Sequence, residues 1–303
     1  MSRFDYKLIR ALSAVIQEQS FERAAKTLFI TQSAISQRLK LLEHEMGQPV
    51  LIRSTPIKAT EVGEKLLKHF YQVDHLEKEL EKQIFPDTNI NKVKIHIAVN
   101  TDSLATWFLT ALSSILKKNS LIELNLLLAD EANTIEKLKS GEAFGAVTLQ
   151  EKPEKACQSD LIGTFRYSLV ATPAFAEKHF PNGVTAEAIA SAPSAAFDQR
   201  DVMHTDFIHQ HFGLEEGDYP LHRIRSTEAF VKLVKSGMAF CLVSDLLILD
   251  ELSSGELVSL LPDFQLEKKL YWQRWALLRG AHKEISDAIL NEGKALLSQI
   301  HAD

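Results

Sequence analysis

The sequence has little of what most enzymes and secreted proteins require. It contains only two cysteines, Cys157 and Cys241, in 303 residues, which is too few for a disulfide framework. Neither cysteine lies in a CxxC or cysteine–histidine spacing, and no phosphate-binding glycine loop or GxSxG hydrolase motif occurs. These absences argue against enzymes of those classes. We expect both thiols to be buried or unreactive, because neither has basic neighbours in the sequence that would activate it.

Long apolar runs are also missing. No eighteen consecutive residues are apolar, and the N-terminus lacks the basic start and apolar run of a secretory signal. We therefore expect a cytoplasmic protein without a membrane span, which argues against a secreted solute-binding protein. The eleven histidines are scattered, and the densest group, His204, His209 and His211, has no carboxylate or cysteine at metal-ligand spacing. We expect these histidines on the surface or at helix caps, and we expect no metal or other cofactor.

The charge is divided unequally along the chain. Its length, with 45% hydrophobic and 24% charged residues, suits two globular domains. Residues 1–60 hold nine Lys or Arg and five Asp or Glu, a net charge of +4, whereas the other 243 residues carry −10. A basic module on an acidic body favours one end approaching a polyphosphate. Because +4 is modest, binding by two or more copies together is expected.

Residues 20–38 predict two short helices that meet at a sharp corner. Ser20 is placed to cap a helix that begins at Phe21, and Thr31 is placed to cap the next helix. Apolar side chains can form the seam between the two helices, and small alanines allow close approach. They are Ala24, Ala25, Leu28, Ile35 and Leu39. This pattern is typical of a helix-turn-helix.

The second of these helices leaves one polar face outside the seam. Gln32, Ser33, Ser36 and Gln37 fall at helical spacing and share that face. Glutamine can pair with adenine, serine can reach base edges or phosphates, and a helix start offers backbone N–H groups to a phosphate. The contacts predicted with double-stranded promoter DNA are therefore Thr31, Gln32, Ser33, Ser36, Gln37 and Arg38. An ordinary solvated face is the alternative.

A two-stranded wing is expected after this helix. Gly47 and Pro49 end the helix, and residues 50–53 and 58–60 suit two short strands. Arg53 and Lys58 are then placed to meet phosphate or the minor groove. Without further context, Arg53 could equally be a solvated charge.

The helix predicted for residues 61–86 serves as a linker. Leu66, Val73 and Leu80 recur every seven residues, with Val62 and Leu76 on the adjacent row, which predicts a dimerising seam. The alternative is a helix packed on its own domain, because the pattern lasts only about three heptads. A dimer would present two recognition helices to two half-sites about one DNA turn apart, or a multiple of it.

From residue 92 onward, strands alternate with helices, which indicates an α/β domain. We expect lobe I to comprise about 92–163 and 267–303, and lobe II about 164–266. The overall fold class is then an all-α winged helix-turn-helix at 1–60, a linker helix at 61–86, and a two-lobed α/β effector domain at 92–303. Such lobes with two crossings resemble periplasmic solute-binding proteins, whose ligands bind in a hinged cleft.

Polar residues collect at the carboxyl ends of the expected strands, where ligands of open α/β folds bind. Hydroxyls and N–H groups at helix starts can hold a carboxylate, whereas the acidic side chains would complement an ammonium or guanidinium group. An amino acid with a cationic side chain meets both needs. The candidate effector residues are Thr101, Asp102, Ser103, Asp130, Glu131, Asp198, Ser226 and Glu228. For each acid taken alone, a helix cap or solvated charge is the alternative.

These segments resemble the LysR-type transcriptional regulators. The resemblance rests on residues 21–28 (FERAAKTL), 31–43 (TQSAISQRLKLLE) and 60–65 (TEVGEK), and it covers the whole chain. Within that family, residues 100–107 (NTDSLATW), 180–185 (FPNGVT), 226–230 (STEAF) and 270–272 (LYW) resemble regulators of arginine and lysine export.

The resemblance implies a homodimer or homotetramer that binds promoter DNA and responds to lysine or arginine. It also allows RNA polymerase as a partner. Two alternatives remain within it: an inhibitor of chromosome initiation that binds the replication origin, and a LysR-type regulator with a different effector.

Overall fold

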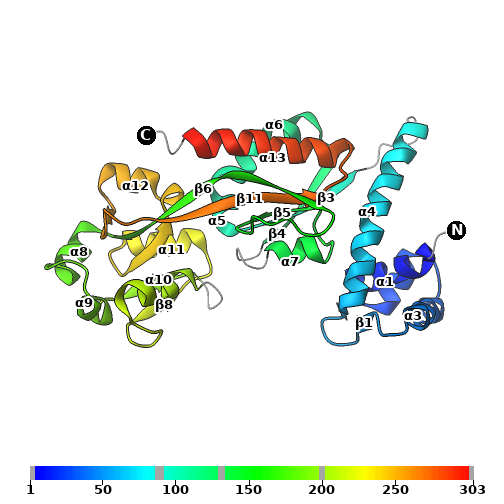
Figure 1. The fold of residues 1–303 in the computed structure, drawn as a ribbon, viewed down its shortest axis with the longest axis horizontal. Helices are drawn as coiled ribbons and strands as arrows, with labels where there is room; N and C mark the ends of the chain where they lie inside the picture. Colours follow the sequence, from blue (N-terminus) through cyan, green and yellow to red (C-terminus); the bar gives the residue numbers. More distant parts are fainter. Residues whose placement is uncertain (1–3, 86–91, 129–133, 198–201, 300–303) are drawn as a thin grey trace.

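The computed structural model describes residues 4–85, 92–128, 134–197 and 202–299. Its N-terminal domain begins with three helices, α1 (Tyr6–Glu18), α2 (Phe21–Thr27) and α3 (Gln32–Met46) (Figure 1). The predicted caps form: the Ser20 hydroxyl accepts the Arg23 N–H, and the Thr31 hydroxyl accepts the Ala34 N–H. Gly47 ends α3 in the left-handed conformation, at φ 68°, where glycine avoids the Cβ clash of other residues.

The wing consists of strands β1 (Leu51–Ile52) and β2 (Lys58–Ala59), which pair antiparallel. The long helix α4 (Glu61–Ile84) follows, with its first turn capped by the Thr60 hydroxyl. The three N-terminal helices and the start of α4 enclose one apolar core, which includes Ile35, Leu39 and Leu66. The winged helix-turn-helix predicted from the sequence is therefore the fold of this domain.

The effector domain is built on one hydrogen-bonded path of strands. Their order is β4-β3-β5-β11-β6-β9-β7-β8, and β10 pairs separately with β6. The strands are β3 (Val93–Val99), β4 (Ile122–Leu128), β5 (Gly145–Thr148), β6 (Cys157–Ala171), β7 (Ser194–Ala196), β8 (Leu221–Arg223), β9 (Phe240–Ser244), β10 (Val258–Ser259) and β11 (Leu266–Trp275). The β3, β4 and β5 strands are parallel in one lobe, and β7, β8 and β9 are parallel in the other.

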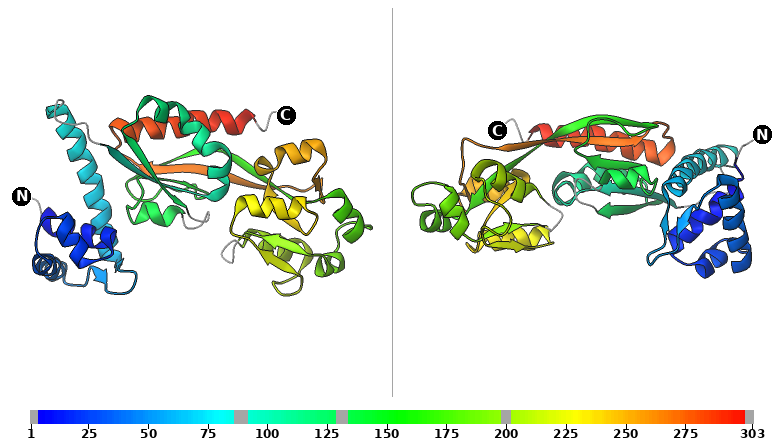
Figure 2. Two further views of the ribbon diagram at one scale, coloured as in Figure 1. Left: turned by 180° about the vertical axis from the view of Figure 1, so that it is seen from behind. Right: turned by 60° about the horizontal axis from the view of Figure 1, so that its bottom comes forward.

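Helices cover both lobes (Figures 1 and 2). Lobe I carries α5 (Thr101–Ser103), the π-helix η2 (Leu104–Phe108), α6 (Leu109–Lys118), α7 (Thr134–Lys139) and α13 (Gly280–Gln299). Lobe II carries α8 (Pro173–His179), α9 (Ala186–Ser191), α10 (Met203–Phe212), α11 (Thr227–Lys235), the 3-10 turn η3 (Asp245–Leu247) and α12 (Leu249–Ser254).

The two lobes are joined by the long strands β6 and β11, which pair antiparallel with each other from Cys157 to Tyr167. Further along, β6 pairs with β9 of lobe II. Tyr167 belongs to both pairings, since it lies opposite Leu266 of β11 and opposite Ser244 of β9. The lobes are thus connected by a shared two-stranded ribbon, with Tyr167 at the point where the chain passes between them.

Two elements differ from what the sequence pattern predicts. The pattern predicts one helix over 103–118, whereas the structure has a π-helical turn at Leu104–Phe108. In that region the Thr106 hydroxyl donates to the Asp102 carbonyl at 2.6 Å, a bond that competes with the regular ladder. The pattern also predicts a strand at 223–225, whereas β8 spans Leu221–Arg223. It ends earlier because the following residues lead into the cap of α11 at Ser226.

The linker helix corrects one part of the sequence interpretation. Leu66 is 6% exposed and lies in the core of its own N-terminal domain, so it is not available to a seam between two copies. Val73 and Leu76 are half-buried, and Leu80 is 54% exposed. The heptad spacing could not distinguish these environments, because it records only which residues share a face. A seam with a partner is therefore restricted to the second half of α4.

We expect Leu66→Ala to lower the free energy of unfolding of the N-terminal domain by about 2–4 kcal/mol, because it removes buried methyl groups and leaves a cavity. Leu80→Ala, on the same helix and in an exposed position, should change it by no more than about 0.5 kcal/mol. Hydrogen exchange of α1–α3 amides in denaturant measures both. Equal losses for the two variants would contradict this assignment of the faces.

Candidate functional site

The polar face of α3 is open to solvent. Gln32, Ser33 and Gln37 are exposed, Ser36 and Arg38 are half-buried, and Ile35 and Leu39 on the other side are completely buried. Thr31 stands at the start of the helix, where its side chain already accepts the Ala34 N–H at 3.1 Å. The predicted DNA-contacting residues therefore share one accessible surface at the start of α3.

The wing lies beside this domain, and both of its predicted basic contacts are exposed. Lys58 pairs with Ile52 across the hairpin, and the Arg53 guanidinium lies 5.6 Å from the centre of the Phe21 ring. This cation–π contact joins the wing to the first turn of α2. The Arg53 side chain is therefore in contact with the helix-turn-helix.

Sequence reasoning missed the residue that attaches the wing. The Gln19 side chain accepts the Ile57 N–H at 2.7 Å and donates to the Ile57 carbonyl at 2.9 Å. Gln19 itself adopts the left-handed conformation at the end of α1, with φ 52°. These two bonds fix the distance between wing and helices. The only available signal was a glutamine in place of the expected glycine at a helix end, which is too weak to identify a partner 38 residues away.

In the effector domain, the predicted residues 101–103 form the first turn after β3, labelled α5 in Figure 1. Ser103 is completely buried, and its hydroxyl makes no hydrogen bond with any residue that the structure describes. The neighbouring Asp102 carboxylate accepts the Tyr167 hydroxyl at 3.1 Å, while Thr101 is half-buried. The Asp102 carboxylate is thus bound to the residue at which the chain passes between the lobes, and an unused hydroxyl follows it in the chain.

The second predicted group stands on the opposite lobe. Ser226 caps α11 by accepting the Ala229 N–H at 3.3 Å, so its hydroxyl has a structural role. Glu228 lines a groove of about 770 Å³ together with Thr227, Val231 and Lys232 of α11, Ala105 of lobe I and Leu247 of η3. The groove is therefore made by both lobes, and its volume is within the range that holds small molecules.

An ion-pair network also lines this groove. The Lys235 ammonium lies 2.7 Å from Glu251 and 3.2 Å from Glu256. The hydrogen bond from Lys235 lowers the pKa of the Glu251 carboxyl below its ordinary value. One ammonium against two carboxylates leaves this network with a net charge of −1. Glu228 and Lys232, one turn apart on α11, are the remaining charged groups that line the groove.

Three predicted effector residues, Asp130, Glu131 and Asp198, lie outside the described residues. Within the described part of the chain, no group of three His, Cys, Asp or Glu side chains is arranged to hold a metal ion. A search of the same residues finds no helix long and apolar enough to cross a membrane.

One of the expectations for the histidines and cysteines is wrong. His204 was expected on the surface, but it is 2% exposed in the core of lobe II, where burial lowers its pKa to about 4. His209 lies 3.1 Å from Glu215, and His211 packs against aromatic rings. Burial raises the pKa of both cysteine thiols, which agrees with unreactive side chains.

The three tryptophans lie in the core of the effector domain. Trp272 is completely buried, and its indole N–H donates to the Ser286 hydroxyl at 2.9 Å. Trp275 and Trp107 are also buried, and Trp107 additionally lines a smaller cavity of about 320 Å³ with Leu246, Leu247 and Leu296. Their principal role is packing.

Comparison with known proteins matches both parts of the chain. Residues 6–64 match the bacterial regulatory helix-turn-helix protein model of the lysR family, and residues 91–291 match the LysR substrate binding domain model. The HTH-type transcriptional regulator ArgP of Aeromonas salmonicida is 52% identical over 98% of this chain and 99% of its own length. ArgP of Photobacterium profundum is 44% identical over 99% of this chain and its whole length.

Solved structures agree with these sequence matches. ArgP from Mycobacterium tuberculosis superposes with a TM-score of 0.84 at 32% identity, covering 96% of this chain and 97% of that protein. Full-length LysG from Corynebacterium glutamicum with bound effector Arg gives a TM-score of 0.78 at 29% identity, covering 96% and 98%. The sequence relatives are named as transcriptional regulators and not as enzymes. The chain belongs to the LysR family of DNA-binding transcriptional regulators, and among its members it is similar to ArgP.

Proposed function

We propose that this regulator senses lysine or arginine and controls the transcription of genes for basic amino acid export. The observation that carries the proposal is the hydrogen bond from the Tyr167 hydroxyl to the Asp102 carboxylate, at the point where the chain passes between the lobes, with the buried, unpaired Ser103 hydroxyl next in the chain. An α-carboxylate needs donors such as the Ser103 hydroxyl, and a cationic group needs a carboxylate such as Asp102. The similarity to ArgP proteins and to LysG with bound Arg supports this choice of effector.

Effector binding would alter the relation between the lobes. Residues 101–103 belong to lobe I, whereas Glu228 belongs to lobe II, so a ligand that contacts both favours one lobe arrangement over another. The lobes are connected through the β6–β11 ribbon, so a change in their arrangement would pass through these two strands. A ligand shifts such an equilibrium only by its differential affinity, and we expect a coupling of about 1–3 kcal/mol.

DNA recognition would use the exposed start of α3 with the wing on its flank. Gln32, Ser33, Ser36 and Gln37 would reach base edges, Arg38 and Thr31 would bind near the backbone, and Arg53 and Lys58 would bind phosphate. Two copies, joined through the second half of α4, would bind two half-sites, as a homodimer or within a homotetramer. RNA polymerase is a further proposed partner. The site of action would be the cytoplasm, where promoter DNA is accessible.

For the effector, we expect lysine and arginine, among the twenty amino acids, to raise the thermal unfolding temperature of the full-length protein. Asp102→Asn should weaken the affinity for both by about tenfold or more, because a charge-assisted bond is lost. Isothermal titration measures the affinity. Asp250→Asn, an exposed change on α12, serves as the control and should retain binding. A thermal response to acidic or aromatic amino acids alone would exclude a cationic effector.

For DNA, we expect Ser33→Ala and Gln37→Ala each to weaken specific binding by about 1–3 kcal/mol while leaving the thermal unfolding temperature unchanged. Arg38→Ala should reduce the slope of log affinity against log salt concentration by about one. Fluorescence anisotropy with duplexes selected by the wild-type protein measures both quantities. Gln48→Ala, exposed beyond the end of α3, is the control. Unchanged affinity and slope would remove these residues from the interface.

A further inference from the structure

One side of the linker helix α4 contacts the effector domain of the same chain. Lys68, Tyr71, His75 and Glu79 are spaced three or four residues apart and therefore share one side of the helix. His75 is 6% exposed and Glu79 is 8% exposed. Among the residues that the structure describes, Glu79 is the only buried carboxylate. Burial of a carboxylate is costly unless its surroundings compensate it, so its neighbours identify its role.

The first contact lies near the middle of the helix. Gly141, at the turn after α7, approaches so closely that an added Cβ would lie 2.8 Å from the Lys68 Cα and 3.1 Å from the Tyr71 ring. Its φ of 79° also favours glycine. Tyr71 packs against the cores of both domains, and its hydroxyl accepts bonds from Ser13 at 3.1 Å and from Gln17 at 3.4 Å. Tyr71 thus links the two domains at one point.

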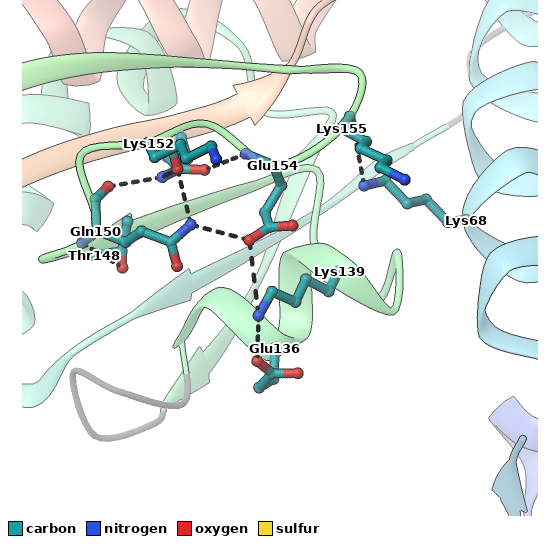
Figure 3. Close-up of polar contacts among 9 residues, drawn as sticks. Lys68, Glu136, Lys139, Thr148, Gln150, Lys152, Glu154 and Lys155 are labelled. Carbon is teal, nitrogen blue, oxygen red and sulfur yellow. Dashed lines mark hydrogen bonds and ion pairs between the residues drawn. The ribbon is translucent and has the colours of Figure 1, made fainter. Parts of the chain in front are cut away.

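The neighbouring Lys68 contacts a loop that is itself firmly held (Figure 3). Its ammonium donates to the Lys155 carbonyl at 3.0 Å. In that loop, the Glu154 carboxylate accepts the Gln150 amide at 3.0 Å and lies 3.7 Å from the Lys139 ammonium (Figure 3). The Glu154 N–H also donates to the Gln273 side chain of β11 at 3.1 Å. This first contact is therefore anchored in the sheet of lobe I.

The second contact joins the last part of α4 to the start of α13. In Figure 1 the start of α13 lies on the side of the effector domain that faces α4. The Glu79 carboxylate lies directly against Gly280, the first residue of α13, and a methyl group added at Gly280 would collide with it. The Arg279 N–H donates to the His75 ring at 3.4 Å, and the His75 and His282 rings are 4.3 Å apart. The start of a helix offers unpaired N–H groups and a positive dipole end, which compensate a buried carboxylate.

Together the two contacts determine both where α4 lies on the effector domain and how its axis is oriented. Lys68 and Glu79 are separated by about 16 Å along the helix axis, at 1.5 Å per residue. One contact alone would leave α4 free to pivot about Tyr71. Two contacts determine the angle at which the linker, and with it the DNA-binding domain, leaves the effector domain.

We propose that Glu79 acts as a positioning residue: by capping α13 of its own effector domain, with Gly280 providing the space, it sets the half-site spacing that the regulator accepts on DNA. The inference rests on the proposed function, since it requires two DNA-binding domains that act together. Glu79 does not contact DNA. Its loss should leave recognition of a single half-site unchanged and relax the preference for one separation over another.

The test uses full-length protein and duplexes that carry two copies of a half-site selected by the wild-type protein, separated by distances that increase one base pair at a time through one helical turn. We expect wild type to prefer its best spacing over the worst by about tenfold or more, and Glu79→Gln to reduce that ratio to about threefold or less. Glu77→Gln removes the same charge from an exposed position of the same helix and should keep the wild-type ratio.

Gly280→Ala tests the other side of the contact. It should relax the spacing preference as Glu79→Gln does, and Glu79→Ala should restore part of the thermal stability that Gly280→Ala loses, because the shorter side chain leaves room for the methyl group. All variants are compared on a single half-site. If Glu79→Gln and Gly280→Ala keep the wild-type spacing ratio, or lose single-half-site binding, the positioning role alone is overturned. A wild-type protein that is indifferent to spacing would overturn the two-domain mode of binding as well.

Discussion

The arrangement of the domains depends on which neighbours each side of helix α4 contacts. The 24 residues of α4 have three sets of neighbours: the core of the N-terminal domain, the effector domain of the same chain, and the solvent or a partner. Leu66 and Leu67 are buried in the first, His75 and Glu79 in the second, and Leu80 and Ile84 remain exposed. Because successive residues of a helix are rotated by a fixed angle, a change in one contact moves all three faces together. A rigid helix therefore transmits orientation between domains that share no core.

The faces of α4 contact the two domains through different kinds of side chains. Apolar packing in the N-terminal domain is insensitive to small shifts in charge and gives a stable platform for α3. The contact with the effector domain uses a carboxylate, a histidine and a helix end, all of which are directional. Directional groups specify one geometry, and their desolvation makes alternative geometries unfavourable. The polar contact between α4 and the effector domain is thus the one that determines the angle of the helix.

The candidate effector residue Asp102 is bonded to the ribbon that joins the two lobes. Tyr167 stands at the register position shared by β11 and β9, and its hydroxyl is held by Asp102 at the start of the first lobe's helix. The π-helical turn that follows, together with the buried Ser103 hydroxyl, shows that this segment departs from the most regular geometry. Under the proposed function, a ligand that replaces or extends these bonds would act directly on the ribbon that joins the lobes.

Local chemistry was enough to predict much of this protein. The caps at Ser20 and Thr31, the exposed polar side of α3 and the alternating α/β pattern follow from hydrogen bonds and periodicities within a few residues, which a sequence records directly. The resemblance to LysR-type regulators was likewise carried by short segments, and the family comparison confirms it. What the sequence could not provide were relations between distant residues. The use of Leu66 within its own domain, the attachment of the wing by Gln19, the burial of His204 and the contact of Glu79 with Gly280 each depend on a partner far along the chain. Only the tertiary structure decides such pairings, because a side chain's type and spacing define which face it occupies but not what that face meets.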